Sequence, residues 1–267
     1  MIDAQIQKKI IQKLKAIEKE HSVEILYACE SGSRSWGFAS PNSDYDVRFI
    51  YKHTLDWYLT FDVERRRDVI EYPIIDEIDC CGWDIRKALY LFSRTNGALM
   101  EWINSPIKYI EVGSFANSMR ILTPKVLNRT ALCYHYSHMA MQNAVECLLK
   151  KQVRLKKYFY TLRPLLAIRY IEKKAALPPV EFEKLVENVA PVQIRPGIKS
   201  LLALKCKSPE LGLSEPIIEI NEFIDSEIDR HRESFKAQGI PDLLTKKEVQ
   251  DSLNQIFQSV IREDSVM

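Results

Sequence analysis

The sequence predicts an α+β protein, with a mixed β-sheet flanked by helices in its N-terminal part and an all-α C-terminal part. Two observations support this prediction. Short segments rich in β-branched and aromatic residues occur almost only before Asp84, whereas apolar residues after it recur at three- and four-residue spacing. The composition shifts between residues 110 and 123, so we predict two domains, over residues 1–115 and 116–267.

The N-terminal part begins with a helix, predicted over 5–19 because isoleucines and a leucine recur at helical spacing among lysines. The β-branched segment 23–30 predicts a strand that leads into a loop of small residues and a short helix starting near Arg34. A second strand is expected over 47–52, after the turn-forming segment ASPNSD. Two further extended stretches are expected around Pro73.

The pattern becomes helical from Asp84, which stands where an N-cap residue belongs. Ile85, Leu89 and Phe92 then share one helix face. Further helices, separated mainly by proline and glycine, are predicted over residues 97–104, 111–119, 124–151, 153–175, 180–190, 215–236 and 246–262.

The composition is that of an ordinary globular protein, with 46% apolar and 28% charged residues. The net charge of +2 is too small for the whole molecule to attract nucleic acid, so such binding would depend on local basic stretches. No apolar run approaches the roughly 20 residues that span a bilayer, and the N-terminus lacks a signal-peptide core. We expect a cytoplasmic protein without a membrane partner, whose six scattered cysteines are reduced. The sequence leaves the oligomeric state open.

Two aspartates give the first indication of chemistry. Asp44 and Asp46 flank Tyr45, and in an extended segment side chains two residues apart project from the same face. Adjacent carboxylates repel each other unless a cation lies between them. Magnesium fits, because it prefers oxygen ligands and is commonly held by one or two carboxylates together with substrate phosphates.

A small-residue loop precedes this pair. Gly32 would let the backbone approach a phosphate, and the Ser33 hydroxyl with the following N–H groups could donate to phosphate oxygens at a helix N-terminus. Arg34 either helps to hold the phosphates or pairs with a nearby carboxylate. The loop does not match the P-loop pattern, because no G-x-x-x-x-G-K-[ST] occurs.

The Gly-Ser pair followed by Asp-x-Asp on a strand-loop-strand background resembles the DNA polymerase beta-like nucleotidyltransferase superfamily. The segments GSRSWGFASPNSDYDVRFIY, GWDIRKAL, EWINSPI and KKYFYTLRPLLAIRYI look most like the predicted RNA-repair-pathway nucleotidyltransferases of bacteria and phages, and the likeness covers most of residues 25–190. The resemblance implies a polymerase-beta-like core with a helical C-terminal domain. It also implies that a nucleotide is attached to a hydroxyl with the help of two metal ions.

The superfamily uses a third carboxylate from a neighbouring strand, and Asp79 is the best match in this sequence, with Asp84 as the alternative. The resemblance thus implies a catalytic and metal-binding set of Asp44, Asp46 and Asp79. Mg²⁺ or Mn²⁺ is the expected cofactor, and a nucleoside triphosphate is the expected substrate. The sequence does not tell which triphosphate is used.

The C-terminal part has one basic stretch with interleaved aromatic residues. On a helix, Lys156, Tyr160 and Arg163 fall on one face, so they are candidates to contact a triphosphate or an RNA backbone. The alternative is an ordinary charged helix exterior. With the family resemblance, this stretch favours an RNA 3′ end as the acceptor.

Two other functions remain open at this point. One is adenylylation of a small molecule or of a partner protein by the same chemistry. The other is a non-catalytic nucleotide-binding or antitoxin-like module that has kept the carboxylates without transferring anything.

Overall fold

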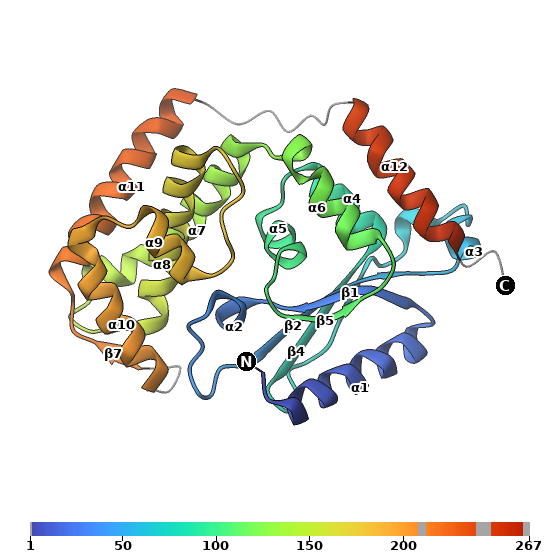
Figure 1. Cartoon of the computed structure of the whole chain (residues 1–267), viewed down its shortest axis with the longest axis horizontal. Coiled ribbons are helices and arrows are strands. Elements are labelled where there is room, and N and C mark those ends of the chain that lie inside the picture. The colour runs from blue at the N-terminus through green and yellow to red at the C-terminus, as the bar shows by residue number, and fades with distance from the viewer. Residues whose placement is uncertain (1, 208–211, 239–246, 264–267) are drawn as a thin grey trace. The chain divides into compact units, whose positions relative to one another are not determined.

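The first part of the chain folds around a five-stranded mixed sheet, which confirms the predicted α+β class (Figure 1). The computed structural model describes residues 2–207, 212–238 and 247–263. The strand order is β3-β4-β2-β1-β5. β2 and β4 run parallel, and the other neighbouring strands are antiparallel. The strands are β1 (Glu24–Glu30), β2 (Tyr45–Lys52), β3 (Val69–Glu71), β4 (Ile78–Asp84) and β5 (Lys108–Glu111).

Helices cover both faces of this sheet (Figure 1). One face is covered by α1 (Ala4–His21), and the other contacts α4 (Ile85–Ser93), α5 (Gly97–Ile103) and α6 (Phe115–Val126). The C-terminal helix α12 (Lys247–Arg262) packs against α4 and α6. Short helical turns follow the first two strands: α2 (Gly32–Trp36), α3 (Leu55–Tyr58) and the 3₁₀ turn Val63–Arg65.

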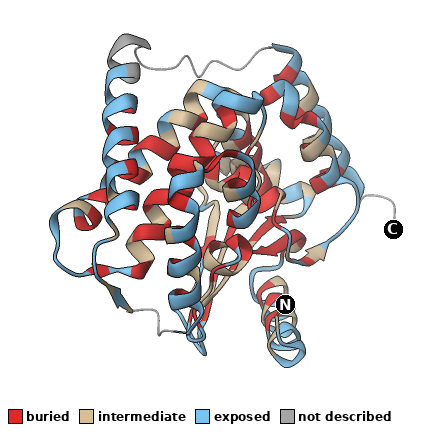
Figure 2. Ribbon diagram, turned by 60° about the vertical axis from the view of Figure 1, so that its left-hand side comes forward, coloured by how far each residue is buried: buried red, intermediate tan, exposed pale blue. Residues whose placement is uncertain are grey.

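The apolar core between α1 and the sheet follows from the helical spacing of apolar residues in α1 and from their alternation along β2. Ile10 and Leu14 of α1 are fully buried, and they belong to one apolar cluster with Val47 and Phe49 of β2. Strand side chains alternate between faces, so Arg48, which lies between these two residues on β2, points to the opposite face. Figure 2 shows the strands largely buried and the outer helix surfaces exposed.

The helical part of the chain has its own apolar core. Its elements are α7 (Arg129–Leu149), α8 (Leu155–Lys174), α9 (Phe182–Val189), α10 (Arg195–Lys207) and α11 (Ile218–Gln238), with a 3₁₀ turn over Val192–Ile194 and a small antiparallel ladder between β6 (Val153–Arg154) and β7 (Leu213–Ser214). Helix α8 is buried on most of its circumference, because α7, α9, α10 and α11 all contact it.

The chain divides into two compact units that differ from the linear division expected from composition. The first unit comprises residues 1–32, 44–126 and 244–267, and the second comprises 33–43 and 127–243. The segment 33–43 joins the helical core because its apolar residues pack there. Phe38 stacks on Phe159 with ring centroids 4.6 Å apart.

Several predicted boundaries need correction. The predicted helix over 111–119 begins only at Phe115, since residues 108–111 form the edge strand β5. The predicted helix over 124–151 is two helices, because Asn128 caps α7 by accepting from the Ala131 N–H at 3.0 Å. Helix α10 was not expected, because Pro196 looked like a helix breaker. Proline is tolerated in the first turn, where its missing N–H costs nothing.

The other predicted helices and strands occur within a few residues of their expected bounds; residue 246, the expected start of the last helix, lies outside the described residues. All six cysteines are free thiols. Within the described residues, no helix is both long and apolar enough to span a membrane.

Candidate active site

The central feature of the site is a pair of carboxylates on adjacent parallel strands. Asp46 of β2 and Asp79 of β4 are register partners. Both lie on the sheet face opposite α1, because Val47 and Cys80 beside them belong to the α1-side core. Nη2 of Arg48 donates to Oδ1 of Asp46 at 2.9 Å and to Oδ2 of Asp79 at 2.7 Å. The two carboxylates therefore converge on one positive group.

Arg48 offsets the repulsion between these carboxylates. Its side chain is 17% exposed, so burial opposes its protonation. The hydrogen bond to Asp79 and the charge of Asp46 outweigh that effect and raise the pKa of the Arg48 guanidinium. The site thus contains a permanent cation at the point where the two acidic side chains meet.

Asp44 lies just before β2 and is half-buried. The strand begins at Tyr45, whose N–H donates to the Glu77 carbonyl at 2.7 Å. Among the residues that the structure describes, no three acidic, histidine or cysteine side chains converge into a preassembled metal site. The three-carboxylate set stays a prediction, and the part of it seen in the geometry is the Asp46–Asp79 pair.

Asp84, the alternative third carboxylate, has another function in the fold. It is 1% exposed and caps α4 by accepting from the Arg86 N–H at 2.8 Å. It also accepts from the Tyr58 hydroxyl at 2.7 Å. Its register partner is Tyr51, five positions beyond Asp46, which is about 16 Å along the strand. Asp84 therefore lies too far from Asp46 to share a cation with it.

Gly32 lies directly against Asp46, one member of the Asp46–Asp79 pair. Its φ is +59°, and a Cβ atom built there would lie 2.0 Å from Oδ2 of Asp46. The residue before Gly32 is also held next to β2, because the Ser31 N–H donates to the Asp46 carbonyl at 2.8 Å. Only glycine combines this backbone conformation with this lack of space. The predicted phosphate loop and the predicted metal residues are thus neighbours.

Gly32 is the first residue of the short helix α2, and Ser33 and Arg34 follow it in that helix. The Ser33 carbonyl accepts from the Phe38 N–H at 3.0 Å, which closes the end of that helix. Nη2 of Arg34 donates to the Ser43 carbonyl at 2.5 Å, across the loop that leads back to Asp44. Arg34 therefore stabilises the loop between the Gly-Ser pair and the aspartates, and its contact with phosphate stays a prediction.

The basic and aromatic residues of α8 lie together around Trp36. Nζ of Lys156 lies 5.3 Å from the centre of the Tyr160 ring, and that ring meets Trp36 edge-on at 5.2 Å. Arg163 is only 1% exposed, with its Cζ atom 4.4 Å from the Trp36 ring centre and Nη2 donating to the Val180 carbonyl at 3.3 Å. The expectation that Arg163 shares an accessible helix face with Lys156 is therefore not met. Arg163 has a packing role, whereas nucleotide binding by Lys156 and Tyr160 stays a prediction.

Two further residues at the site were not identified from the sequence. Arg48 could have been found, because alternation along β2 places it on the same face as Asp46. Glu30 is fully buried and accepts from the Asp46 N–H at 3.0 Å and from the Tyr109 hydroxyl. A single acid at the end of an apolar strand gives no signal of this role. Glu30 fixes the start of β2 and thereby the backbone of Asp46.

Comparisons with known proteins show which family the chain belongs to. The model of the RNA repair pathway DNA polymerase beta family matches residues 6–259. The uncharacterized protein YcgL of Bacillus subtilis (strain 168) is 42% identical over 259 residues, which cover 97% of each chain. A nucleotidyltransferase-like protein from Exiguobacterium sibiricum 255-15 is 14% identical over 95% of this chain and 80% of its own, with a TM-score of 0.30 that is too low to support an argument. On the strength of the family model and of the YcgL match, the chain belongs to the RNA repair pathway DNA polymerase beta family.

Proposed function

We propose that the protein is a metal-dependent nucleotidyltransferase that transfers a nucleoside monophosphate from a nucleoside triphosphate to a hydroxyl group. The observation that carries this proposal is the Asp46–Asp79 pair, whose carboxylates converge on one positive charge across two parallel strands. The family supports the same class of reaction.

The donor atoms of this pair fit Mg²⁺ or Mn²⁺. Such ions take hard oxygen ligands and are commonly bound by one or two carboxylates plus substrate phosphates, so a preassembled cage is not needed. Asp46 and Asp79 would hold the ion, and Asp44 is placed in sequence to join them. When bound, the metal supplies positive charge for the triphosphate and lowers the pKa of the acceptor hydroxyl.

The chain's own groups bind and orient the triphosphate. Gly32 keeps its backbone close to the Asp46 carboxylate, and the Ser33 hydroxyl with the neighbouring N–H groups would bind a phosphate of the triphosphate. This positioning favours in-line attack on the α-phosphate, with pyrophosphate as the leaving group. We favour an RNA 3′ hydroxyl as the acceptor, because the matching family is described as part of an RNA repair pathway.

Label transfer tests the proposal. The protein is incubated with Mg²⁺ or Mn²⁺, each α-labelled nucleoside triphosphate and total RNA. We expect labelled RNA from the wild type, and a loss on the order of 10³-fold in Asp46→Asn and Asp79→Asn, because metal binding supplies several kcal/mol of charge stabilisation. Asp56→Asn, at an exposed aspartate of α3, is the matched control and should keep full activity.

The acceptor is tested with RNA whose 3′ diol has been oxidised by periodate. We expect this treatment to abolish labelling if the 3′ end is the acceptor. Labelling of a protein or of an added small hydroxyl compound, with none of RNA, would instead identify a different acceptor. No transfer under any condition, with the wild type equal to the Asp46→Asn variant, would contradict the proposal and favour a non-catalytic nucleotide-binding module.

A further inference from the structure

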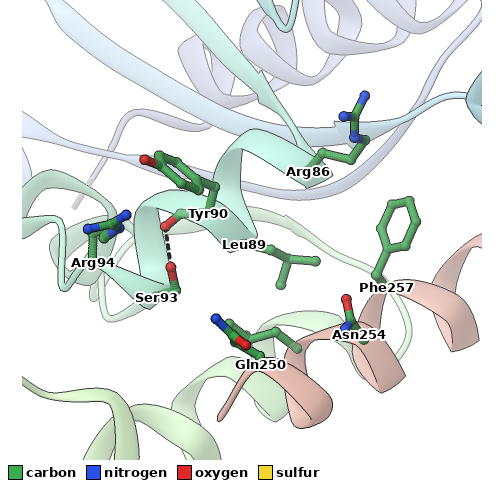
Figure 3. Close-up of a pocket in the computed structure, with 9 residues that line it drawn as sticks. Arg86, Leu89, Tyr90, Ser93, Arg94, Gln250, Asn254 and Phe257 are labelled. Carbon is green, nitrogen blue, oxygen red and sulfur yellow. Dashed lines mark hydrogen bonds between the residues drawn. The ribbon is translucent and has the colours of Figure 1, made fainter. Parts of the chain in front are cut away.

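A cavity of ≈ 490 Å³ lies between α4 and α12 in the first compact unit (Figure 3). Its size falls within the range of about 300–1,000 Å³ that is usual for ligand sites. Helix α4 follows the C-terminal end of β4, whereas Asp79 lies near the other end of that strand. The five residues from Asp79 to Asp84 span about 16 Å. The cavity is therefore distinct from the candidate active site.

The lining combines an apolar floor with a polar and cationic rim. Leu89 of α4 and Leu253 of α12 are each 7% exposed and form part of the floor. The ring of Tyr90 is at the rim and is 60% exposed. The other polar and aromatic residues around it are Arg86, Ser93, Arg94, Gln250, Asn254 and Phe257. The lining thus contains two arginines and no carboxylate, which suits an anionic ligand with an aromatic part.

The spacing of the cationic and aromatic residues points to more than one phosphate. Arg86, Tyr90 and Arg94 occur at four-residue intervals, so they follow one face of α4 and its C-terminal cap. The Arg94 guanidinium lies 5.4 Å from the Tyr90 ring centre. The backbones of the two arginines are about 12 Å apart along the helix axis, and Arg86 also donates to the Val63 carbonyl at 3.4 Å, which draws it away from Arg94. A ligand with two separated phosphates and an aromatic group between them fits this spacing better than a single phosphate.

The facing helix supplies groups that suit a nucleobase. Gln250 and Asn254 are four residues apart on α12, and Figure 3 shows both on the side of that helix that borders the cavity. Each amide offers donors and an acceptor for the edge of a base. Phe257, one turn further along, adds a second aromatic ring to the rim.

We propose that this cavity binds a short segment of single-stranded polynucleotide. One base packs against Tyr90 and the apolar floor, and the flanking phosphates contact Arg86 and Arg94. Proteins bind single strands by this combination of stacking on aromatic rings and cationic contacts along the backbone. The site goes beyond the proposed transfer reaction and does not depend on it, because none of its residues belongs to the metal or phosphate-loop set.

Binding without metal separates this site from catalysis. A fluorescein-labelled RNA octamer of mixed sequence is titrated in EDTA, and affinity is measured by anisotropy at several salt concentrations. We expect Tyr90→Ala to weaken binding about 5- to 150-fold, the factor contributed by one stacked base. Arg86→Gln and Arg94→Gln should each lower the slope of log affinity against log salt by about 0.7. The matched control Arg232→Gln, at an exposed arginine of α11, should change neither.

Crosslinking of the unaltered protein gives an independent test. An octamer that contains 4-thiouridine is irradiated with the wild-type protein, and the crosslinked peptides are identified by mass spectrometry. We expect crosslinks within residues 85–94 or 247–262. Crosslinks confined to other segments would overturn the proposal. It would also be overturned by wild-type affinity in all three cavity variants, or by AMP binding as tightly as the octamer.

Discussion

Gly32 and Asp46 are in direct contact, so closely that a side chain at position 32 would overlap the Asp46 carboxylate. This contact joins two motifs that are separated in the sequence by the loop 33–43. It also fixes the geometry of the predicted phosphate loop relative to one candidate metal ligand. The contact can be tested because the chain has a second glycine with positive φ nearby in sequence.

Gly32→Ala should impair both stability and transfer. The left-handed backbone costs an alanine about 1–2 kcal/mol, and the new methyl group must displace Asp46. Gly37→Ala is the matched control, because Gly37 has a φ of +88° but no atom within 4 Å of its Cβ position. Urea unfolding and label transfer measure the two effects. If the two variants have equal activity, the contact with Asp46 has no role in the site.

Arg48→Met should leave Asp46 and Asp79 facing each other without a cation. All three side chains are less than a third exposed, so we expect the free energy of unfolding to fall by about 2 kcal/mol. Mg²⁺ should then raise the melting temperature of the variant more than that of the wild type, because the ion replaces the missing charge.

The control for this experiment is Arg67→Met. Arg67 pairs with Glu71 at 2.6 Å on the surface, where its side chain is 67% exposed, and such pairs contribute little. This variant should respond to Mg²⁺ as the wild type does. An identical response of Arg48→Met to Mg²⁺ would contradict a cation site between the two aspartates.

His53 should make stability depend on pH. It stacks on Trp57 with ring centroids 3.9 Å apart, and burial together with the charge of Arg66 lowers the pKa of its imidazole from 6.5 to about 4. Between these values the unfolded chain binds more protons than the folded one. This contribution is therefore complete above the unfolded pKa and is lost as pH falls through the folded pKa.

His53→Phe keeps the aromatic stack and removes the titrating group. We expect the free energy of unfolding of this variant, relative to the wild type, to rise as pH is lowered from 6.5 to about 4 and to stay constant at higher pH. Urea denaturation at several pH values measures the difference. A difference that does not change over this window would show that His53 is not responsible.

Variants of Arg163 and Lys156 should distinguish a residue of α8 that stabilises the fold from one that binds a ligand. Arg163→Met removes a buried guanidinium from the Trp36 ring and the Val180 carbonyl, so we expect a loss of about 2 kcal/mol in stability. Lys156→Ala should change stability by less than about 0.5 kcal/mol and weaken triphosphate or RNA binding. A variant of Lys156 with unchanged affinity for both ligands would remove it from the candidate site.

The fold class could be predicted because its signals are local. The helical spacing of Ile10 and Leu14 and the β-branched segment around Tyr27 each depend on residues close together in the chain. The edge strand 108–111 was missed because it is four residues long, and its pairing with β1 lies outside any local pattern. That the short segment 33–43 packs with the helical core was not predicted for the same reason, since only the folded core shows what Phe38 packs against.

The site was predicted in part. Asp46 and Gly32 belong to one short motif, so spacing alone singles them out. Asp79 lies beside Asp46 because β2 and β4 pair in parallel, and this pairing joins residues more than thirty positions apart. No local pattern shows such a pairing, so Asp79 was selected by family resemblance. Alternation along β2 places Arg48 on the same face as Asp46, but its contact with Asp79 depends on the packed structure. The burial of Arg163 also depends on packing and could not be derived from sequence periodicity.

Lys52, only 2% exposed, donates from Nζ to the backbone carbonyl of Val260 at 2.9 Å. During translation this acceptor is synthesised after every residue of the second unit. The Lys52 hydrogen bond of the first unit cannot form until Val260 has been synthesised. All residues of the helical unit are available before then, so that unit can fold first. In nascent chains stalled before residue 247, we therefore expect residues 127–207 to resist protease and the strands of the sheet to be cleaved.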